Sequence, residues 1–99
     1  MMKTFMVEVR LPFEPPKEFF ALIPSQRAMV IDLLMKRKFL SYTLAADRSK
    51  VWIVMVAETE TDARTLLAAQ PMDTYFSYIF TELMFHDMAG ALFPSVSLN

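Results

Sequence analysis

The chain has 99 residues, of which 55% are hydrophobic, and its formal net charge at pH 7 is −1. This length allows one domain, and a net charge near zero gives no electrostatic reason to expect binding to nucleic acid or to an anionic membrane. The sequence has no cysteine, which excludes disulfides and cysteine metal sites. Because the N-terminus does not resemble a signal peptide and no apolar run approaches the roughly 18–20 residues of a membrane span, we expect a soluble cytoplasmic protein without a membrane partner.

The first elements expected along the chain are a strand and a long helix. In Lys3–Leu11 apolar and polar side chains alternate, which indicates a strand with one apolar face. Lys17–Lys38 carries apolar residues close to the helical period, but Pro24 lies inside this pattern. Because an internal proline removes a backbone hydrogen bond and clashes with the preceding turn, we expect a kink or break at Leu22–Ser25, with Ser25 as a candidate N-cap.

A hairpin follows, made of the predicted strands Phe39–Ala46 and Lys50–Ala57. The residues between them, Asp47, Arg48 and Ser49, are of types that favour a turn. The second of these strands is an unbroken apolar run, which is typical of a strand that is covered on both faces. Because a chain of this size with two helices covers only one face of a sheet, we expect a second copy of the chain to cover the other face.

A second helix and a fourth strand complete the predicted elements. The helix begins after Thr59, whose spacing to Asp62 resembles a capping box, and Pro71 stops it. Tyr75–His86 is apolar at odd and even positions alike and is predicted as the fourth strand. Residues 88–99 form a tail with several large apolar side chains, which we expect to pack on a neighbouring subunit.

The order β-α-β-β-α-β predicts an α+β domain of the ferredoxin-like type over residues 1–87, with a four-stranded antiparallel sheet. Right-handed crossovers place both helices on one face of the sheet and the first and third strands in its middle. The opposite face is then open in a single chain. Pairing two such faces would give a homodimer, an α+β barrel with a buried chamber between the sheets, and a larger homo-oligomer is the open alternative.

Three short motifs resemble the muconolactone Δ-isomerase family, whose members are small ferredoxin-like α+β barrel proteins that form dimers and larger rings. Leu11–Pro12, followed by Pro16 and Glu18, resembles the family's Leu-Pro and its Pro-x-Asp/Glu helix start. Gln70–Met72 is similar to the family's Leu-Pro-Leu, and Thr81–His86 to its closing Thr-x-Leu-x-x-His. The resemblance implies a cofactor-free isomerase that moves a proton next to a carbonyl in a small lactone or acidic organic molecule.

The sequence departs from that family's pattern at several positions. Arg27 stands where the family has Glu in the first helix, and Lys38 stands where its Gly ends that helix. The hairpin Gly-Arg is replaced by Asp47 and Arg48, and the Pro after the final His is Asp87. These departures favour the alternative function, a non-catalytic oligomeric module of the same fold that binds a small hydrophobic ligand or only assembles.

Glu8, Arg10 and His86 are the candidate residues for proton transfer and anion binding. Glu8 and Arg10 share one strand face, which points into the chamber between the sheets if the helices cover the other face. There Glu8 would act as the base and Arg10 would hold a carboxylate or enolate; a structural ion pair or a solvated sheet face is the alternative. His86, the only histidine, would transfer a proton or bind a lactone carbonyl, or else it is a strand-end histidine bonded to backbone.

Aromatic residues and one arginine are the candidates for substrate binding. Tyr42, Trp52, Tyr75 and Tyr78 would line a pocket for a flat organic ligand, or else belong to the core or the dimer interface. Arg48 on the hairpin would reach the mouth of a pocket, or else is a solvated turn residue. One histidine without further ligands argues against a metal site, and a single glycine excludes a glycine-rich phosphate loop. We therefore expect neither a metal nor a cofactor.

Overall fold

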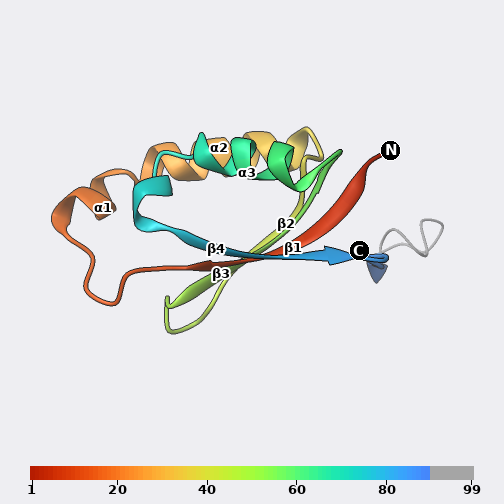
Figure 1. The fold of residues 1–99 in the computed structure, drawn as a ribbon. Helices are drawn as coiled ribbons and strands as arrows, with labels where there is room; N and C mark the ends of the chain where they lie inside the picture. Colours follow the sequence, from red (N-terminus) through yellow and green to blue (C-terminus); the bar gives the residue numbers. More distant parts are fainter. Residues whose placement is uncertain (90–99) are drawn as a thin grey trace.

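A computed structural model of the chain describes residues 1–89, which form the α+β fold shown in Figure 1. The elements are β1 (Lys3–Arg10), α1 (Lys17–Ala21), α2 (Ile23–Met35), β2 (Phe39–Leu44), β3 (Lys50–Ala57), α3 (Glu60–Ala68), a 3-10 helix η1 (Asp73–Tyr75) and β4 (Ser77–Leu83). The four strands form one antiparallel sheet in the order β2-β3-β1-β4. This arrangement confirms the predicted ferredoxin-like βαββαβ fold.

Strand β1 lies in the middle of the sheet because it pairs with a neighbour on both sides. It pairs with β3 from Lys3, opposite Ala57, to Arg10, opposite Lys50. On its other side it pairs with β4. The prediction that the first and third strands are central is therefore confirmed.

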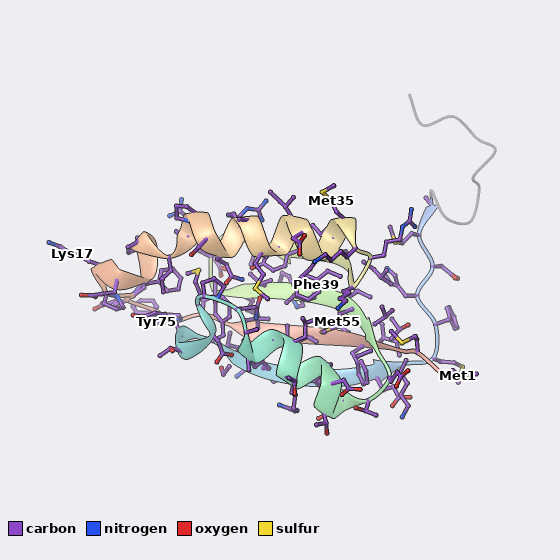
Figure 2. The ribbon with its side chains drawn as sticks, turned by 90° about the horizontal axis from the view of Figure 1, so that it is seen from above. Met1, Lys17, Met35, Phe39, Met55 and Tyr75 are labelled. Atoms are coloured by element: carbon purple, nitrogen blue, oxygen red, sulfur yellow. The ribbon has the colours of Figure 1, made fainter. Side chains whose placement is uncertain are left out.

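Helices α2 and α3 lie over one face of the sheet, as Figure 1 shows from the side and Figure 2 from above. The alternating pattern of β1 sends Phe5, Val7 and Val9 toward these helices, where all three are buried. The core between the two layers also contains Val30, Leu33, Phe39, Ile53, Met55, Ala63 and Leu67. Removing these apolar side chains from water is the main force that holds the helices on the sheet.

The predicted break in the first helical segment is confirmed, and it lies at Leu22, between α1 and α2. Leu22 caps α2, and Pro24 occupies the first turn of that helix, where the missing N–H of proline breaks no hydrogen bond. The prediction of Ser25 as the cap is wrong, because its hydroxyl lies within the first turn and donates to the Leu22 carbonyl at 3.0 Å. The break lets α1 extend beyond the sheet at one end of the molecule, beside the loop from β1 (Figure 1).

The fourth strand is shorter than predicted. It spans Ser77–Leu83 rather than Tyr75–His86, because Asp73–Tyr75 forms a 3-10 helix and the pairing with β1 stops at Leu83. His86 therefore follows the last strand instead of ending it.

Specific backbone contacts end α2 and begin α3. The backbone N–H of Arg37 donates to the carbonyl of Leu34 at 3.1 Å, and that of Lys38 donates to Leu33 at 3.0 Å. This pattern requires a left-handed residue between helix and strand, and Arg37 has a φ of 59°. Thr59 caps α3 as predicted, since its hydroxyl accepts a backbone N–H of the first turn at 3.0 Å.

The face of the sheet away from the helices is open in the single chain. Glu8, Trp52 and Ile79 stand opposite one another across β1, β3 and β4 on this face. Trp52 is 36% exposed, whereas Val54, two residues along β3 on the same face, is only 3% exposed. The apolar run of β3 is therefore covered in part by the chain itself and in part left to solvent.

The predicted tail, 88–99, lies outside the described residues from residue 90 onward. Within residues 1–89, every helix is too short or too polar to cross a bilayer.

Candidate ligand-binding site

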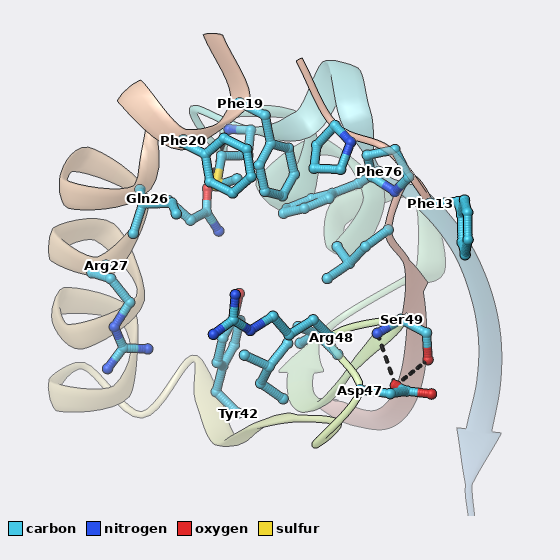
Figure 3. A pocket seen from close by; sticks show the side chains of 17 residues that line it. Phe13, Phe19, Phe20, Gln26, Arg27, Tyr42, Asp47, Arg48, Ser49 and Phe76 are labelled. Carbon is cyan, nitrogen blue, oxygen red and sulfur yellow. Dashed lines mark hydrogen bonds between the residues drawn. The ribbon is translucent and has the colours of Figure 1, made fainter. Parts of the chain in front are cut away.

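A cavity of about 1000 Å³ opens at one end of the molecule, on the helix side of the sheet (Figure 3). Its walls come from the loop after β1, from α1 and α2, from the β2–β3 hairpin and from the segment before β4. In an antiparallel sheet with this strand order, the C-terminal end of β1, the β2–β3 hairpin and the N-terminal end of β4 lie at the same end of the strands. The fold itself therefore brings these distant parts of the sequence together around one space.

One wall of the cavity is aromatic. Phe19 and Phe20 of α1 pack edge to face with ring centroids 5.4 Å apart, and Phe19 makes a similar contact with Tyr75 at 5.5 Å. Phe76 and Phe13 also line the cavity. Figure 3 shows Phe19, Phe20 and Phe76 grouped on one side of it, with Phe13 farther out at its margin. Phe13 is 96% exposed, so the rest of the described chain leaves this ring free to contact a ligand.

The opposite wall carries positive charge. Arg27 comes from α2, Arg48 from the hairpin and Tyr42 from β2. The Arg27 Cζ atom lies 6.0 Å from the centroid of the Tyr42 ring, a cation–π distance. Figure 3 shows the guanidinium of Arg48 extending from the hairpin across the cavity toward α2. Two cations thus approach the same space from two different elements.

The hairpin turn explains why Arg48 is free to point into the cavity. Asp47 accepts hydrogen bonds from the Ser49 backbone N–H at 3.0 Å and from the Ser49 hydroxyl at 2.6 Å. These bonds hold the pKa of Asp47 below its ordinary value, so this carboxylate is ionised at neutral pH and is a weak base. Arg48 has a φ of 63°, and its backbone N–H donates to Ala45 at 2.9 Å. The turn therefore fixes the Arg48 backbone while Asp47 is engaged by Ser49.

A buried pair of glutamines adjoins the charged wall, and one of them, Gln26, lines the cavity. Gln26 and Gln70 are only 3% and 4% exposed, and Gln26 Nε2 donates to Gln70 Oε1 at 2.9 Å. Gln26 Oε1 accepts the backbone N–H of Met72 at 3.2 Å. Gln70 Nε2 donates to the Leu67 carbonyl at 3.1 Å. Buried amides need such partners to offset their loss of water, and here the partners also fix which way each amide points.

Two tyrosines adjoin this pair. The Tyr78 hydroxyl accepts from Gln70 Nε2 at 3.0 Å and donates to Asp73 Oδ1 at 2.6 Å. Burial, together with the hydrogen bond to Asp73 and its negative charge, strongly raises the pKa of Tyr78. Burial also raises the pKa of Tyr42, and this rise exceeds the lowering by a hydrogen bond from Gln26 and by the positive charge of Arg27. Both phenols are therefore protonated at neutral pH and can donate a hydrogen bond.

Three of the residues predicted as substrate contacts lie on the helix side of the sheet. Arg48 and Tyr42 line the cavity. Tyr78 lies deeper, in the hydrogen-bonded cluster with Gln70 and Asp73, and does not line the cavity.

Tyr75, the remaining predicted aromatic contact on a cavity-side element, packs against Phe19 but does not line the cavity. The other predicted residues lie elsewhere. Glu8, Arg10 and Trp52 belong to the open face of the sheet, where Arg10 Nε donates to Glu8 Oε2 at 2.8 Å. This bond, ahead of smaller electrostatic effects, lowers the pKa of Glu8. His86 follows β4 and is half-buried, and its Nε2 atom is buried without a hydrogen-bond partner among the described residues. The structure therefore divides the predicted site residues among separate places.

Sequence reasoning missed Gln26, Arg27 and the phenylalanine wall as site residues. One signal was present for Gln26, which lies three residues after Ile23 and four before Val30, within the apolar stripe of the helix. A polar side chain at such a position needs a buried partner. The partner, Gln70, is 44 residues away, so the sequence alone did not reveal it.

Within residues 1–89 no three histidine, cysteine, aspartate or glutamate side chains are grouped so that they could hold a metal ion. Comparison of the sequence with protein-family models and with curated proteins finds no match.

The chemistry that this cavity offers is hydrogen-bond donation next to an aromatic surface. Arg27, Arg48 and the Tyr42 hydroxyl can all donate, and the Asp47 carboxylate is held by Ser49. A group that accepts hydrogen bonds and carries negative charge therefore fits the charged wall, while a flat apolar group fits the phenylalanine wall.

Proposed function

We propose that the protein binds a small organic acid with a flat apolar body in this cavity. The observation that supports the proposal is the division of one cavity of about 1000 Å³ into an aromatic wall and a wall with two guanidinium groups. The carboxylate of the ligand would contact Arg48 and Arg27, because guanidinium groups pair well with carboxylates. The ring would lie against Phe19 and Phe20. Small-molecule sites combine an apolar lining with a few placed polar groups in this way.

A calorimetric titration tests the proposal with benzoate and with benzamide, its neutral analogue of similar shape. We expect the wild type to bind benzoate more tightly. The Arg48→Gly variant keeps a turn with positive φ, so it removes the guanidinium with little effect on the hairpin. It should weaken benzoate binding roughly tenfold or more, since a hydrogen bond to a charged group contributes about 1.5–3 kcal/mol, and should change benzamide binding little.

Arg37→Gly is the matched control, because Arg37 is also a left-handed arginine but does not line the cavity. It should bind benzoate as the wild type does. Equal affinity of the wild type for benzoate and benzamide, or an unchanged benzoate affinity in Arg48→Gly, would contradict the proposal.

A cofactor-free isomerase of the muconolactone type is the second candidate. It is favoured by one observation, that Arg48 and Tyr42, both assigned to the substrate from the sequence, line the same cavity. The protonated phenol of Tyr42 is suited to donate to a lactone carbonyl, which would stabilise the enolate formed when a proton leaves the neighbouring carbon. Glu8 and His86, the proton acceptors inferred from the sequence, do not line this cavity, so a reaction on a lactone held by Tyr42 would need another base.

Deuterium exchange tests the isomerase directly. The protein is incubated in deuterium oxide with muconolactone, and NMR follows deuterium entry at the carbon next to the carbonyl. Loss of exchange in Tyr42→Phe or Arg48→Gly would assign the reaction to the cavity. Loss in Glu8→Gln or His86→Asn would assign the proton transfer to those residues. A wild type no faster than buffer would reject the isomerase and leave ligand binding as the function.

We also propose that the partner of this chain is a second copy, joined through the open face of the sheet. Trp52 and Ile79 leave apolar surface in water there, and burying such surface favours association. Glu8 and Arg10 lie on the same face with opposite charges, so a two-fold axis through it would let each pair contact its counterpart.

A further inference from the structure

We infer that the ligand of this cavity is an elongated acid with more than one ring, and that Phe13 is a specificity-determining residue that contacts the ring farthest from the carboxylate. The inference rests on the proposed binding of an organic acid and names the class of acid. It also gives a role to an aromatic side chain that the rest of the described chain leaves in water.

Several large apolar side chains that line the cavity are exposed to solvent. They are Phe13, Phe20, Ile23 and Leu44, and Phe13 is the most exposed of them at 96%. They come from four parts of the fold, namely the loop after β1, α1, α2 and β2. Single exposed apolar residues are common on protein surfaces, whereas a group of them around one space is typical of a place where a ligand is bound. An apolar ligand body that covers this group extends well beyond one ring.

The cavity has room for such a body. Its volume of about 1000 Å³ lies at the upper end of the roughly 300–1,000 Å³ that sites for drug-sized ligands occupy. Leu11, Pro12 and Pro15 line it together with Phe13, so the loop after β1 adds an apolar surface of its own. A single ring placed on the phenylalanines of α1 would leave this surface in water, and a second ring would cover it.

The positions of the charged groups set the direction of the ligand. Figure 3 shows Arg27 and Phe13 on opposite sides of the cavity, with the guanidinium of Arg48 on the side of Arg27. A carboxylate paired with these guanidinium groups therefore directs the far end of a long body toward Phe13. A short acid held in the same way would not extend to this ring.

The loop that carries Phe13 is held at both of its ends, although the ring is free. The backbone N–H of Leu11 donates to the Ser49 carbonyl at 3.0 Å, and that of Phe19 donates to the Pro16 carbonyl at 3.1 Å. One proline directly precedes Phe13 and two more follow it closely, and each restricts the backbone. A ring on a restrained loop loses little freedom when a ligand covers it, so more of the contact contributes to affinity.

Three acids test the inference by calorimetric titration at neutral pH: benzoate, biphenyl-4-carboxylate and biphenyl-2-carboxylate. The two biphenyl acids have the same composition, but only the 4-isomer carries its second ring in line with the carboxylate. We expect the wild type to bind the 4-isomer roughly tenfold or more tightly than either of the other acids, because its second ring is removed from water in the cavity.

Two substitutions separate the ends of the ligand. Phe13→Ala should weaken the binding of biphenyl-4-carboxylate roughly three- to tenfold and change benzoate binding little, since only the longer acid reaches the ring. Because Phe13 is almost fully exposed, this substitution leaves the core intact. Arg48→Gly should weaken both acids by a similar factor, because each carries one carboxylate. Phe85→Ala is the matched control: Phe85 is also exposed but does not line the cavity, so both affinities should stay those of the wild type.

The outcomes distinguish the inference from the proposed function. A wild type that binds benzoate without preferring the 4-isomer, or an unchanged affinity of Phe13→Ala for the 4-isomer, would overturn the inference while the proposed function stands. If none of the three acids binds, or if Arg48→Gly leaves binding of the 4-isomer unchanged, the proposed function is rejected and the inference with it.

Light scattering on Phe13→Ala tests the other possible occupant, a second copy of the chain. We expect the mass of the wild type, because the open face of the sheet and not the cavity is the proposed interface. A smaller mass together with unchanged affinities for the acids would assign Phe13 to a contact between subunits and overturn the inference.

Discussion

Two arginines of this chain occupy the left-handed region of the backbone, where glycine is the usual residue. Arg37 and Arg48 have φ values of 59° and 63°, and a side chain in this region costs roughly 1–2 kcal/mol. At Arg48 this cost accompanies the proposed binding role, because the turn directs the guanidinium into the cavity. Arg37 lies outside the cavity, on an exposed helix end. The left-handed conformation thus places a side chain in the cavity at Arg48, whereas at Arg37 it only lets the chain turn from α2 into β2.

At the residue scale we predict a pH-dependent effect of Glu8→Gln. The hydrogen bond from Arg10 lowers the folded-state pKa of Glu8, so the ionised carboxylate stabilises the fold at neutral pH, and this contribution is lost as the pH falls through the folded-state pKa. Glu8→Gln should therefore lower the free energy of unfolding slightly at pH 7, and the difference from the wild type should shrink as the pH falls below the ordinary glutamate pKa of about 4.3 and vanish once the pH is below the lowered pKa of folded Glu8.

Urea denaturation at several pH values measures this difference. Glu14→Gln, in the exposed loop after β1, is the control and should differ less from the wild type at pH 7. A difference for Glu8→Gln that persists undiminished at low pH would show that its cause is not the charge of Glu8.

At the element scale we predict that Arg37→Gly stabilises the end of α2. Glycine adopts the required positive φ without steric cost, although its freedom in the unfolded chain offsets part of the gain. The net increase in the free energy of unfolding should reach up to about 1 kcal/mol. Lys36→Gly is the matched control: Lys36 has a φ of −81°, so glycine there should destabilise by roughly 0.5–1 kcal/mol. Equal effects of the two substitutions, measured by thermal unfolding, would contradict the prediction.

The elements could be predicted because each rests on a local pattern. Alternating side chains marked β1, and Thr59 marked the start of α3, so both are confirmed. Ser25 was mistaken for a cap because proline is tolerated throughout the first helical turn, so a helix can begin before Pro24. The fourth strand was predicted too long because apolar residues continue into η1. Periodicity alone does not distinguish a strand from a turn there.

The site could be predicted only in part, for a related reason. Arg48 and Tyr42 were predicted as ligand contacts because of their positions on a turn and a strand, and both line the cavity. Glu8 and Arg10 were assigned to a chamber because charges on a central strand suggest function, but within one chain they bond to each other. The cavity arises where α1 bends away from α2 beside the hairpin, and such a meeting of distant segments has no signature in local sequence.

At the scale of the whole molecule, the open face predicts a dimer in solution. Light scattering and sedimentation should give twice the mass of the chain at micromolar concentration. Trp52→Lys should give the mass of the monomer, because it places a charge in the proposed interface. Met35→Lys, on the outer side of α2, is the control and should remain dimeric. A wild-type monomer at all concentrations would reject the second copy as the partner.

The emission of Trp52 gives a second reading of the same equilibrium. It is the only tryptophan of the chain and lies on the open face, away from the cavity lining. Dilution to the monomer should shift its fluorescence to longer wavelength as the ring becomes exposed to water, whereas added benzoate should have little effect.

The cavity and the N-terminus lie at opposite ends of the sheet. The cavity lies beside α1 and the hairpin, whereas the N-terminus and the end of β4 lie at the far end of the molecule (Figure 1). Tethering the protein to a solid support through its N-terminus would therefore leave the mouth of the cavity facing the liquid. Immobilised in this way, the chain could be washed with one candidate acid after another, and the anchor itself would not obstruct their entry.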